Sequence, residues 1–177
     1  SLVHSKNPLL AIRIVDELRF HVGEARLVIF GGGSLRGECE TEAAFVNERH
    51  GGVVVEFGKP EDYFATLSIA SVFLSLQDFD NYPSQSLMEG MAFGCRCVCT
   101  SDGDTSLMFP SGSDDHALID SRDALDFVPA CRNFIGLTSP SKVNSDYIRK
   151  NHTISRFSEY FDRFLHDMVR PAIADLR

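Results

Sequence analysis

The chain has 177 residues, of which 44% are hydrophobic and 24% are charged, and its formal net charge is −8. This composition is typical of a globular protein and predicts one domain spanning residues 1–177. The acidic charge argues against a nucleic-acid-binding surface, which requires a basic patch. No apolar run approaches the roughly 20 residues that cross a bilayer, so no transmembrane segment is predicted.

The five cysteines do not form a disulfide framework in this sequence, because their number is odd and their spacing is irregular. Cys95, Cys97 and Cys99 alternate along a predicted strand, where neighbours on one face stand about 6.6 Å apart. Thiolates that share one zinc ion lie closer than this. We therefore expect buried strand thiols and no metal site, and free thiols predict a reducing, cytoplasmic location.

In chain order, the first predicted element is a helix that begins at Asn7 and Pro8 and closes at Gly23. Apolar runs bounded by glycine turns then predict five strands, at 26–30, 53–57, 71–76, 95–100 and 117–119. Short helices are predicted between them, around 39–46, 63–67 and 84–93. This alternation predicts an α/β fold, a Rossmann-like doubly wound parallel sheet.

The last third of the chain carries weaker signals. Ser121 is predicted to cap a helix that runs through Ala124, Phe127 and Ala130-Cys131, with Pro129 as a candidate kink. The Ser/Pro-rich stretch 138–145 is expected to be a connector. Apolar residues at helical spacing predict a terminal amphipathic helix, namely Phe157, Phe161, Phe164, Leu165 and Met168.

The central motif is Asp80-Asn81-Tyr82-Pro83-Ser84-Gln85, which forms the turn of a βαβ unit and leads into a helix that contains Glu89. Ligands in such sheets sit beyond the carboxyl ends of the strands. Pro83 suits the first helical turn, and Ser84 to Ser86 present backbone N–H groups to an anion. The motif predicts a phosphate-binding site beside Glu89, which would accept hydrogen bonds from ligand hydroxyls. Two alternatives stay open: the N–H groups serve only in helix capping, and Glu89 is a solvated residue.

The run from Leu87 to Gly94, Leu-Met-Glu-Gly-Met-Ala-Phe-Gly, resembles the second part of the two-Glu motif of family-4, GT-B type glycosyltransferases. Asp80-Asn81-Tyr82-Pro83 resembles a variant in which Asn81 replaces the first Glu. Further similarities to the carboxyl-terminal half of these enzymes occur at Lys6-Asn7-Pro8, in the turn Gly31–Gly33 and at Val55-Glu56-Phe57-Gly58. The segment Ser101-Asp102-Gly103-Asp104 departs from the family, which carries Gly-Gly there.

The resemblance implies the donor-binding half of a GT-B fold, in a retaining, metal-independent enzyme that needs no cofactor and takes a nucleoside-diphosphate sugar as donor. It implies that Glu89 fixes the ribose, that Asn81 contacts the sugar, and that Lys6 binds the diphosphate. Further diphosphate contacts are implied for the backbone at Tyr82, Pro83, Ser84 and Gln85. Contacts near the nucleotide base are implied for Gly31, Gly33, Phe57 and Gly58.

The resemblance also implies partners outside this chain. We expect the chain to be the carboxyl-terminal part of a longer two-domain protein, with its first strand before Ser1, and to transfer little sugar alone. The expected acceptor is a glycan or lipid-linked saccharide in polysaccharide biosynthesis, with the protein cytoplasmic or peripheral to the inner face of a membrane. Two alternatives remain: a non-catalytic nucleotide-sugar-binding or partner domain, and a sugar-nucleotide epimerase of the related fold.

Overall fold

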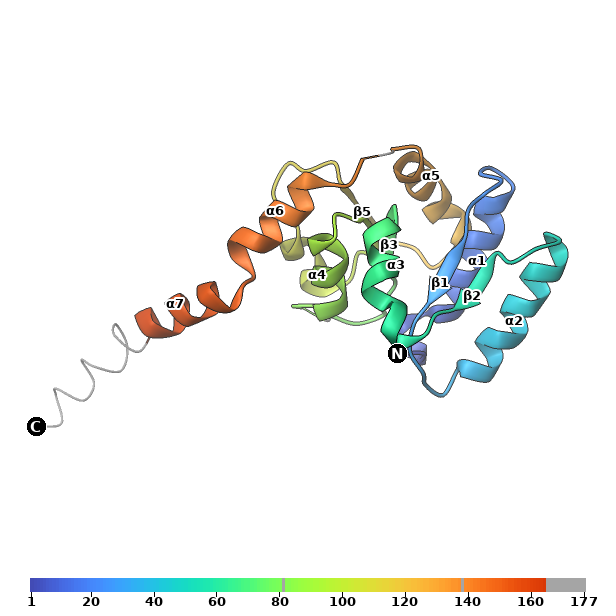
Figure 1. Ribbon diagram of the computed structural model, residues 1–177, viewed down its shortest axis with the longest axis horizontal. Coiled ribbons are helices and arrows are strands. Elements are labelled where there is room, and N and C mark those ends of the chain that lie inside the picture. Colours follow the sequence, from blue (N-terminus) through green and yellow to red (C-terminus); the bar gives the residue numbers. More distant parts are fainter. Residues whose placement is uncertain (81, 138, 165–177) are drawn as a thin grey trace, which may run out of the picture.

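The computed structural model describes residues 1–80, 82–137 and 139–164 (Figure 1). Asn81, Leu165 and Met168, on which sequence predictions fall, lie outside the described residues. None of the helices in these ranges has the length and apolar content needed to cross a membrane.

The centre of the described chain consists of short parallel strands, each within a predicted strand or overlapping one. They are β1 (Leu27–Ile29), β2 (Val55–Phe57), β3 (Val72–Ser75), β4 (Arg96–Thr100) and β5 (His116–Ile119). All pairings are parallel and form two sheets, one of β1 and β2 and the other of β3, β4 and β5. The predicted α/β class is therefore confirmed, but among the described residues no ladder joins β1 to β3.

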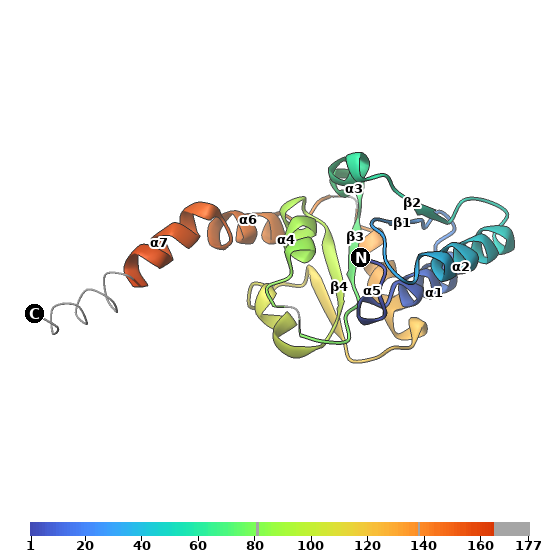
Figure 2. The same ribbon diagram turned by 90° about the horizontal axis from the view of Figure 1, so that it is seen from below.

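Helices lie on both faces of the strands (Figures 1 and 2). The α-helices are α1 (Pro8–Arg19), α2 (Arg36–Arg49), α3 (Tyr63–Ile69), α4 (Gln85–Ala92), α5 (Ala124–Ile135), α6 (Lys142–Asn151) and α7 (Ile154–Phe164). Short 3-10 helices are η1 (His4–Lys6), η2 (Pro60–Asp62) and η3 (Gly103–Met108), the last with a kink at Asp104. Helix α7 extends away from the α/β body in both views.

Strand β4 shows how the sequence divides the core, because all of its residues are buried and alternate between two faces. Val98 packs into the larger core with α1 and α5. Cys97 and Cys99 pack into the smaller core with α4 and α6. The cysteines are buried and free, as predicted. Burial raises the pKa of Cys97 and lifts that of Cys95 to about 11, so these thiols stay protonated at neutral pH.

A largely buried network of polar side chains lies at the amino end of β4. The Arg96 Nε donates to Asp115 Oδ1 at 2.9 Å, and the Ser141 hydroxyl donates to Asp115 Oδ2 at 2.6 Å. The buried Asn144 amide donates to the Cys95 carbonyl at 2.9 Å. Because Ser141 and Asn144 belong to the start of α6, the network ties that helix to the amino end of the strand.

Two predictions about the last third of the chain are wrong. The stretch 138–145 is not a connector throughout, because Ser141 accepts the backbone N–H of Asn144 at 3.0 Å and caps α6. Asp123, not Ser121, caps α5 and accepts the Leu125 N–H at 3.0 Å. In both cases the sequence offered several capping residues close together, and propensity does not choose among them.

Candidate functional site

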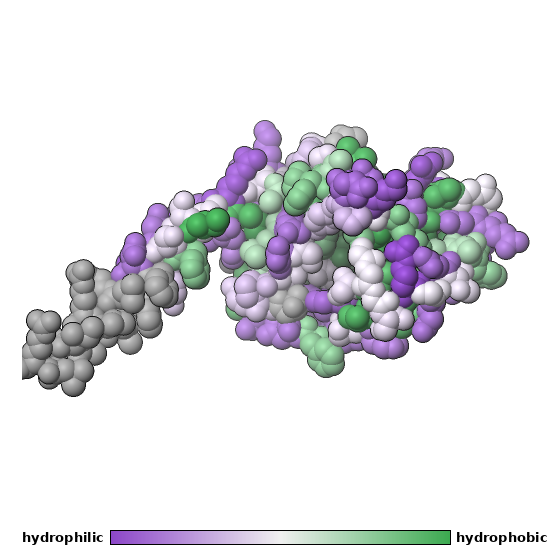
Figure 3. All heavy atoms as spheres, turned by 60° about the horizontal axis from the view of Figure 1, so that its bottom comes forward, coloured by the Kyte–Doolittle hydropathy of each residue, from purple (hydrophilic) through white to green (hydrophobic). Residues whose placement is uncertain are grey.

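The candidate site lies where the strands end at their carboxyl termini. We call this edge the rim; it comprises residues 1–7 and the loop residues 30–35, 57–60, 76–80, 82–84, 101–104 and 120–123. Figure 3 brings the lower side of Figure 1 forward, where the strands end, and shows hydrophilic side chains interrupted by small apolar areas.

Glu89 is half-buried in α4, and two donors fix its carboxylate. The Tyr63 hydroxyl donates to Oε2 at 2.8 Å, and the Gln85 amide donates to Oε1 at 3.0 Å. Burial, together with the hydrogen bond to this carboxylate, raises the pKa of Tyr63, so its hydroxyl remains a donor at neutral pH. The Tyr63 ring meets the Phe30 ring edge-on at 5.1 Å. Glu89 is thus oriented toward the loop that follows β1.

The end of β2 joins the same group of rings. A Cβ on Gly58 would stand 2.3 Å from the Phe30 ring, so only glycine permits this approach. The Arg36 guanidinium lies 4.1 Å from the centroid of the Phe57 ring and donates to the Gly31 carbonyl at 3.3 Å. We call Phe30, Phe57, Gly58, Tyr63, Glu89 and Arg36 the aromatic end of the rim.

The turn Gly31–Gly33 packs against the amino-terminal segment. Leu2 donates its N–H to the Gly32 carbonyl at 2.9 Å, and its own carbonyl accepts the Leu35 N–H at 3.0 Å. A Cβ on Gly33 would stand 2.2 Å from the Leu2 carbonyl oxygen, and Gly31 has a φ of +104°. The backbone geometry alone therefore requires both glycines, and their contact with a nucleotide stays a prediction.

A second group, the charged end of the rim, surrounds Arg122. Its Nε donates to Asp78 Oδ1 at 2.8 Å, and its terminal nitrogen donates to Asp102 Oδ2 at 2.6 Å. This guanidinium holds the pKa of Asp78 below its ordinary value. The Lys6 ammonium donates to the side-chain oxygen of the buried Gln77, and burial lowers the pKa of Lys6.

The central motif differs from its prediction in two details. Asp80 Oδ1 accepts the N–H groups of Tyr82 and Asp104 at 3.1 and 3.2 Å, so the predicted Tyr82 donor is occupied within the chain. Pro83 lies outside the first helical turn, because Ser84 is the N-cap and α4 begins at Gln85.

The start of α4 retains the predicted backbone donors. No side chain caps this terminus, and among the described residues no hydrogen bond occupies the N–H groups of Ser84, Gln85 and Ser86. The first N–H groups of a helix have no acceptor within the helix. The helix ends as predicted before Gly94, whose φ is +81°.

No protein-family model matches the sequence, and no curated protein matches it. Solved structures do match. The chain superposes on a structure titled "Crystal structure of GtfA/B complex" with a TM-score of 0.73 at 15% identity over 94% of this chain. It superposes on the pneumococcal O-GlcNAc transferase GtfA in complex with UDP and GlcNAc with a TM-score of 0.73 at 14% identity over 95% of this chain. For AviGT4, a glycosyltransferase involved in avilamycin A biosynthesis, the TM-score is 0.60 at 18% identity over 92% of this chain.

The fold is that of one half of a GT-B enzyme. The chain spans 34% of the length of each of the first two neighbours and 48% of the third. At these identities the likeness describes the fold, and the chemistry of the site has to be argued from the residues themselves.

Within this fold, the structure places predicted residues in two separate groups. Phe57, Gly58 and Glu89 lie at the aromatic end, and Lys6 lies at the charged end. No hydrogen bond or ion pair joins Lys6 to Glu89 among the described residues. Sequence reasoning missed four residues that hold these groups in place: Arg36, Tyr63, Gln77 and Arg122.

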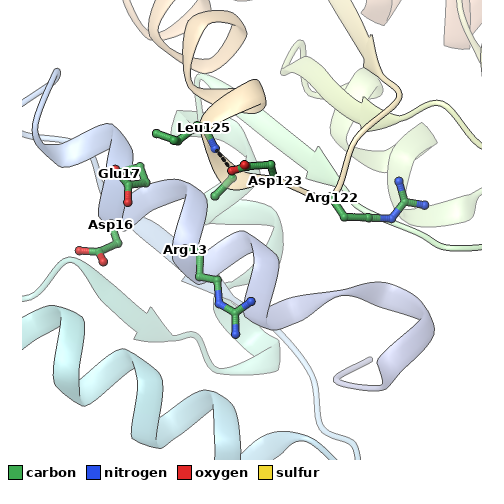
Figure 4. A pocket seen from close by; sticks show the side chains of 7 residues that line it. Arg13, Asp16, Glu17, Arg122, Asp123 and Leu125 are labelled. Atoms are coloured by element: carbon green, nitrogen blue, oxygen red, sulfur yellow. Dashed lines mark hydrogen bonds between the residues drawn. The ribbon is translucent and has the colours of Figure 1, made fainter.

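Two surface hollows lie beside the rim or away from it. One groove of about 500 Å³ runs between α1 and the start of α5, where Arg13, Asp16, Glu17, Arg122 and Asp123 line it (Figure 4). Its charges are of both signs, so it offers no field that selects an anion. A second hollow of about 510 Å³ lies along α5. In the described ranges, no cluster of His, Cys, Asp or Glu side chains is arranged to hold a metal ion.

Proposed function

We propose that this chain is the donor-binding domain of a retaining, metal-independent glycosyltransferase and that it holds a nucleoside-diphosphate sugar at the rim. One observation carries the proposal: a half-buried carboxylate, Glu89, is fixed by two donors one turn inside a helix whose first N–H groups meet no acceptor among the described residues. The likeness to GT-B glycosyltransferases, one of them bound to UDP and GlcNAc, agrees with it.

The nucleoside belongs at the aromatic end in this proposal. A carboxylate has about four lone-pair sites, and the donors from Tyr63 and Gln85 use two of them. The remaining sites suit the two hydroxyls of a ribose. The base would contact the loop at Phe57 and Gly58, beside the Arg36 guanidinium.

The diphosphate belongs at the start of α4. A helix amino terminus attracts anions through its free N–H groups and its dipole, and here Ser84, Gln85 and Ser86 supply them. Lys6 adds a positive charge at the start of the loop after β3, where its ammonium donates to Gln77. Charge grows on the leaving phosphate during transfer, and preorganised donors at that position lower the barrier. Asn81 is proposed to contact the transferred sugar.

The acceptor belongs outside this chain. The residues proposed to bind the donor lie on the rim, at one edge of the domain. We propose that a second domain supplies the opposite wall, the acceptor site and the water exclusion that transfer requires. The 177-residue chain would then bind the nucleotide but transfer little sugar.

Thermal unfolding with UDP, GDP and ADP tests the donor site. A ligand at 100 times its Kd stabilises the folded state by about 2.7 kcal/mol, which raises Tm by several degrees in a domain of this size. We expect one nucleotide to raise Tm, and Glu89→Gln to reduce that rise. Glu48→Gln, an exposed change on α2, serves as the control and leaves the rise intact. A chain that unfolds at the same temperature with every nucleotide at millimolar concentration would refute the donor site.

A further inference from the structure

Gln77 is a buried polar residue at the charged end of the rim. It lies two residues after β3 and is 5% exposed, whereas its neighbour Asp78 is exposed. A buried amide is stable only when its polar atoms have hydrogen-bond partners. The side-chain oxygen of Gln77 accepts from the Lys6 ammonium, and its nitrogen donates to the Ser75 hydroxyl at 3.4 Å. Both ends of the buried amide are therefore used, and one of them meets Lys6.

The backbone of Gln77 is fixed as well. Its N–H donates to the hydroxyl oxygen of Thr100 at 2.9 Å, and its carbonyl accepts from that hydroxyl at 2.7 Å. The same carbonyl accepts from Arg122 at 3.1 Å. Thr100 is the last residue of β4, so these bonds hold Gln77 between the ends of β3 and β4. A shift of Gln77 would break them.

The chemistry of Lys6 decides which end of the Gln77 amide faces it. An ammonium has three N–H donors and no acceptor, so the amide oxygen must face Lys6. The Ser75 hydroxyl both donates and accepts, and it can therefore pair with the amide nitrogen. A glutamine at this position thus presents a neutral acceptor to a charged group.

The segment that carries Lys6 is tied to the residue after Gln77. The Ser5 carbonyl accepts the N–H of Asp78 at 3.1 Å, and the Asn7 side-chain amide donates to Asp78 Oδ1 at 2.5 Å. Lys6 lies between these two contacts and adds its own bond to Gln77. The position of the ammonium is therefore fixed by its neighbours in the chain and by its own acceptor.

The contacts of Lys6 leave its charge available. Among the described residues Lys6 forms no ion pair, and the nearby carboxylates Asp78 and Asp102 pair with Arg122. Its contact with Gln77 uses one of three donors, which leaves two. A carboxylate at position 77 would neutralise the ammonium, whereas the neutral amide holds it in place with its charge intact.

We infer that Gln77 is a positioning residue for Lys6 and that it makes the rim selective for nucleoside diphosphates over nucleoside monophosphates. This inference rests on the proposed donor site. The free N–H groups at the start of α4 can hold one phosphate group. A second phosphate group needs a cation, and charge-assisted hydrogen bonds from Lys6 supply it because Gln77 fixes the ammonium without neutralising it.

Binding of UDP and UMP to the 177-residue chain tests the inference by isothermal titration calorimetry, with GDP and GMP and with ADP and AMP measured likewise. Gln77→Glu keeps an acceptor of the same size and adds a charge that pairs with Lys6. We expect this variant to bind the diphosphate at least about tenfold more weakly, because a hydrogen bond to a charged group has this strength. The affinity for the monophosphate should stay nearly unchanged.

Two further variants separate positioning from a role in stability. In a Lys6→Met background, Gln77→Glu should leave the ratio of diphosphate to monophosphate affinity unchanged, because no ammonium remains to be neutralised. Asn144→Asp is the matched control, since it makes the same amide-to-acid change in a buried side chain at the amino end of β4. We expect it to lower the free energy of unfolding and to leave that ratio intact.

The failure of this inference differs from the failure of the donor site. If the parent chain binds no nucleotide, the donor site is refuted and the inference falls with it. If the parent chain binds nucleotides but Gln77→Glu leaves the affinity ratio unchanged, the inference is wrong and the donor site stands. A changed ratio in the Lys6→Met background would also overturn it, because Gln77 would then act through another group. If Gln77→Glu does not fold, Gln77→Met removes the acceptor without adding a charge, and the same loss of preference for the diphosphate is expected.

Discussion

The two ends of the rim use their charged groups differently. At the aromatic end, Glu89 is held by neutral donors, Tyr63 and Gln85, and among the described residues it takes part in no ion pair. At the charged end, Arg122 forms ion pairs with Asp78 and Asp102. The first arrangement leaves a carboxylate ready for an external donor, whereas the second leaves little positive charge for an external anion.

This contrast indicates what each end can recognise unaided. Asp80 and Asp104 add two further carboxylates beside Asp78 and Asp102, while the cations at the charged end are Lys6 and Arg122. The aromatic end contains the groups a nucleoside needs. The charged end is short of cations for a diphosphate, so the proposed function requires further positive charge from residues outside this chain.

The largest expected effect comes from crowding the aromatic end with Gly58→Ala. The new Cβ would stand 2.3 Å from the Phe30 ring and displace it from Tyr63. Overpacking of this kind costs about 1–3 kcal/mol, measured as a lower free energy of unfolding in urea. Gly32→Ala is the matched control, since its Cβ would meet no atom within 4 Å. Equal stability of the two variants would show that the aromatic end is not packed as described.

Tyr63→Phe tests the hydrogen bond that orients Glu89. We expect a loss of about 1 kcal/mol in the free energy of unfolding and weaker nucleotide binding. The pKa of Tyr63 is raised by folding, so this contribution is fully present below the unfolded pKa of about 10 and is lost at higher pH. Tyr160→Phe, on the exposed side of α7, is the control. If Tyr63→Phe weakens binding no more than this control does, the hydroxyl does not position Glu89 for a ligand.

The smallest effect is expected from Arg122→Ala at the charged end. Its ion pairs are well exposed to solvent, so the loss should stay below about 1 kcal/mol at neutral pH. Because Arg122 lowers the pKa of Asp78, the difference from the parent chain is present above about pH 4 and shrinks as the pH falls further. Unfolding in urea across pH 2–7 measures it, with Arg132→Ala on the outer face of α5 as control. If the difference in the free energy of unfolding does not change with pH, the ion pair between Asp78 and Arg122 does not contribute to it.

Local patterns predicted the order of the elements because each depends on neighbouring residues. The apolar runs at β3 and β4, the helical spacing of Leu87 and Met91 and the stop at Gly94 are all readable within a few positions. The placement of Glu89 in α4 was predictable for the same reason.

Long-range partners were not predictable in this way. Tyr63 meets Glu89 across 26 positions, and Arg122 meets Asp78 across 44. Neither residue carries a local signal, since a tyrosine in a short helix and an arginine in a loop are ordinary surface residues.

The polar network at the amino end of β4 has a practical consequence for handling the protein. Through Ser141 and Asn144 it fastens α6 to the end of the strands remote from the rim, and α7 leads away from the body (Figure 1). A surface attachment placed after α6 would therefore leave the rim, where we propose the donor binds, free for immobilised binding measurements.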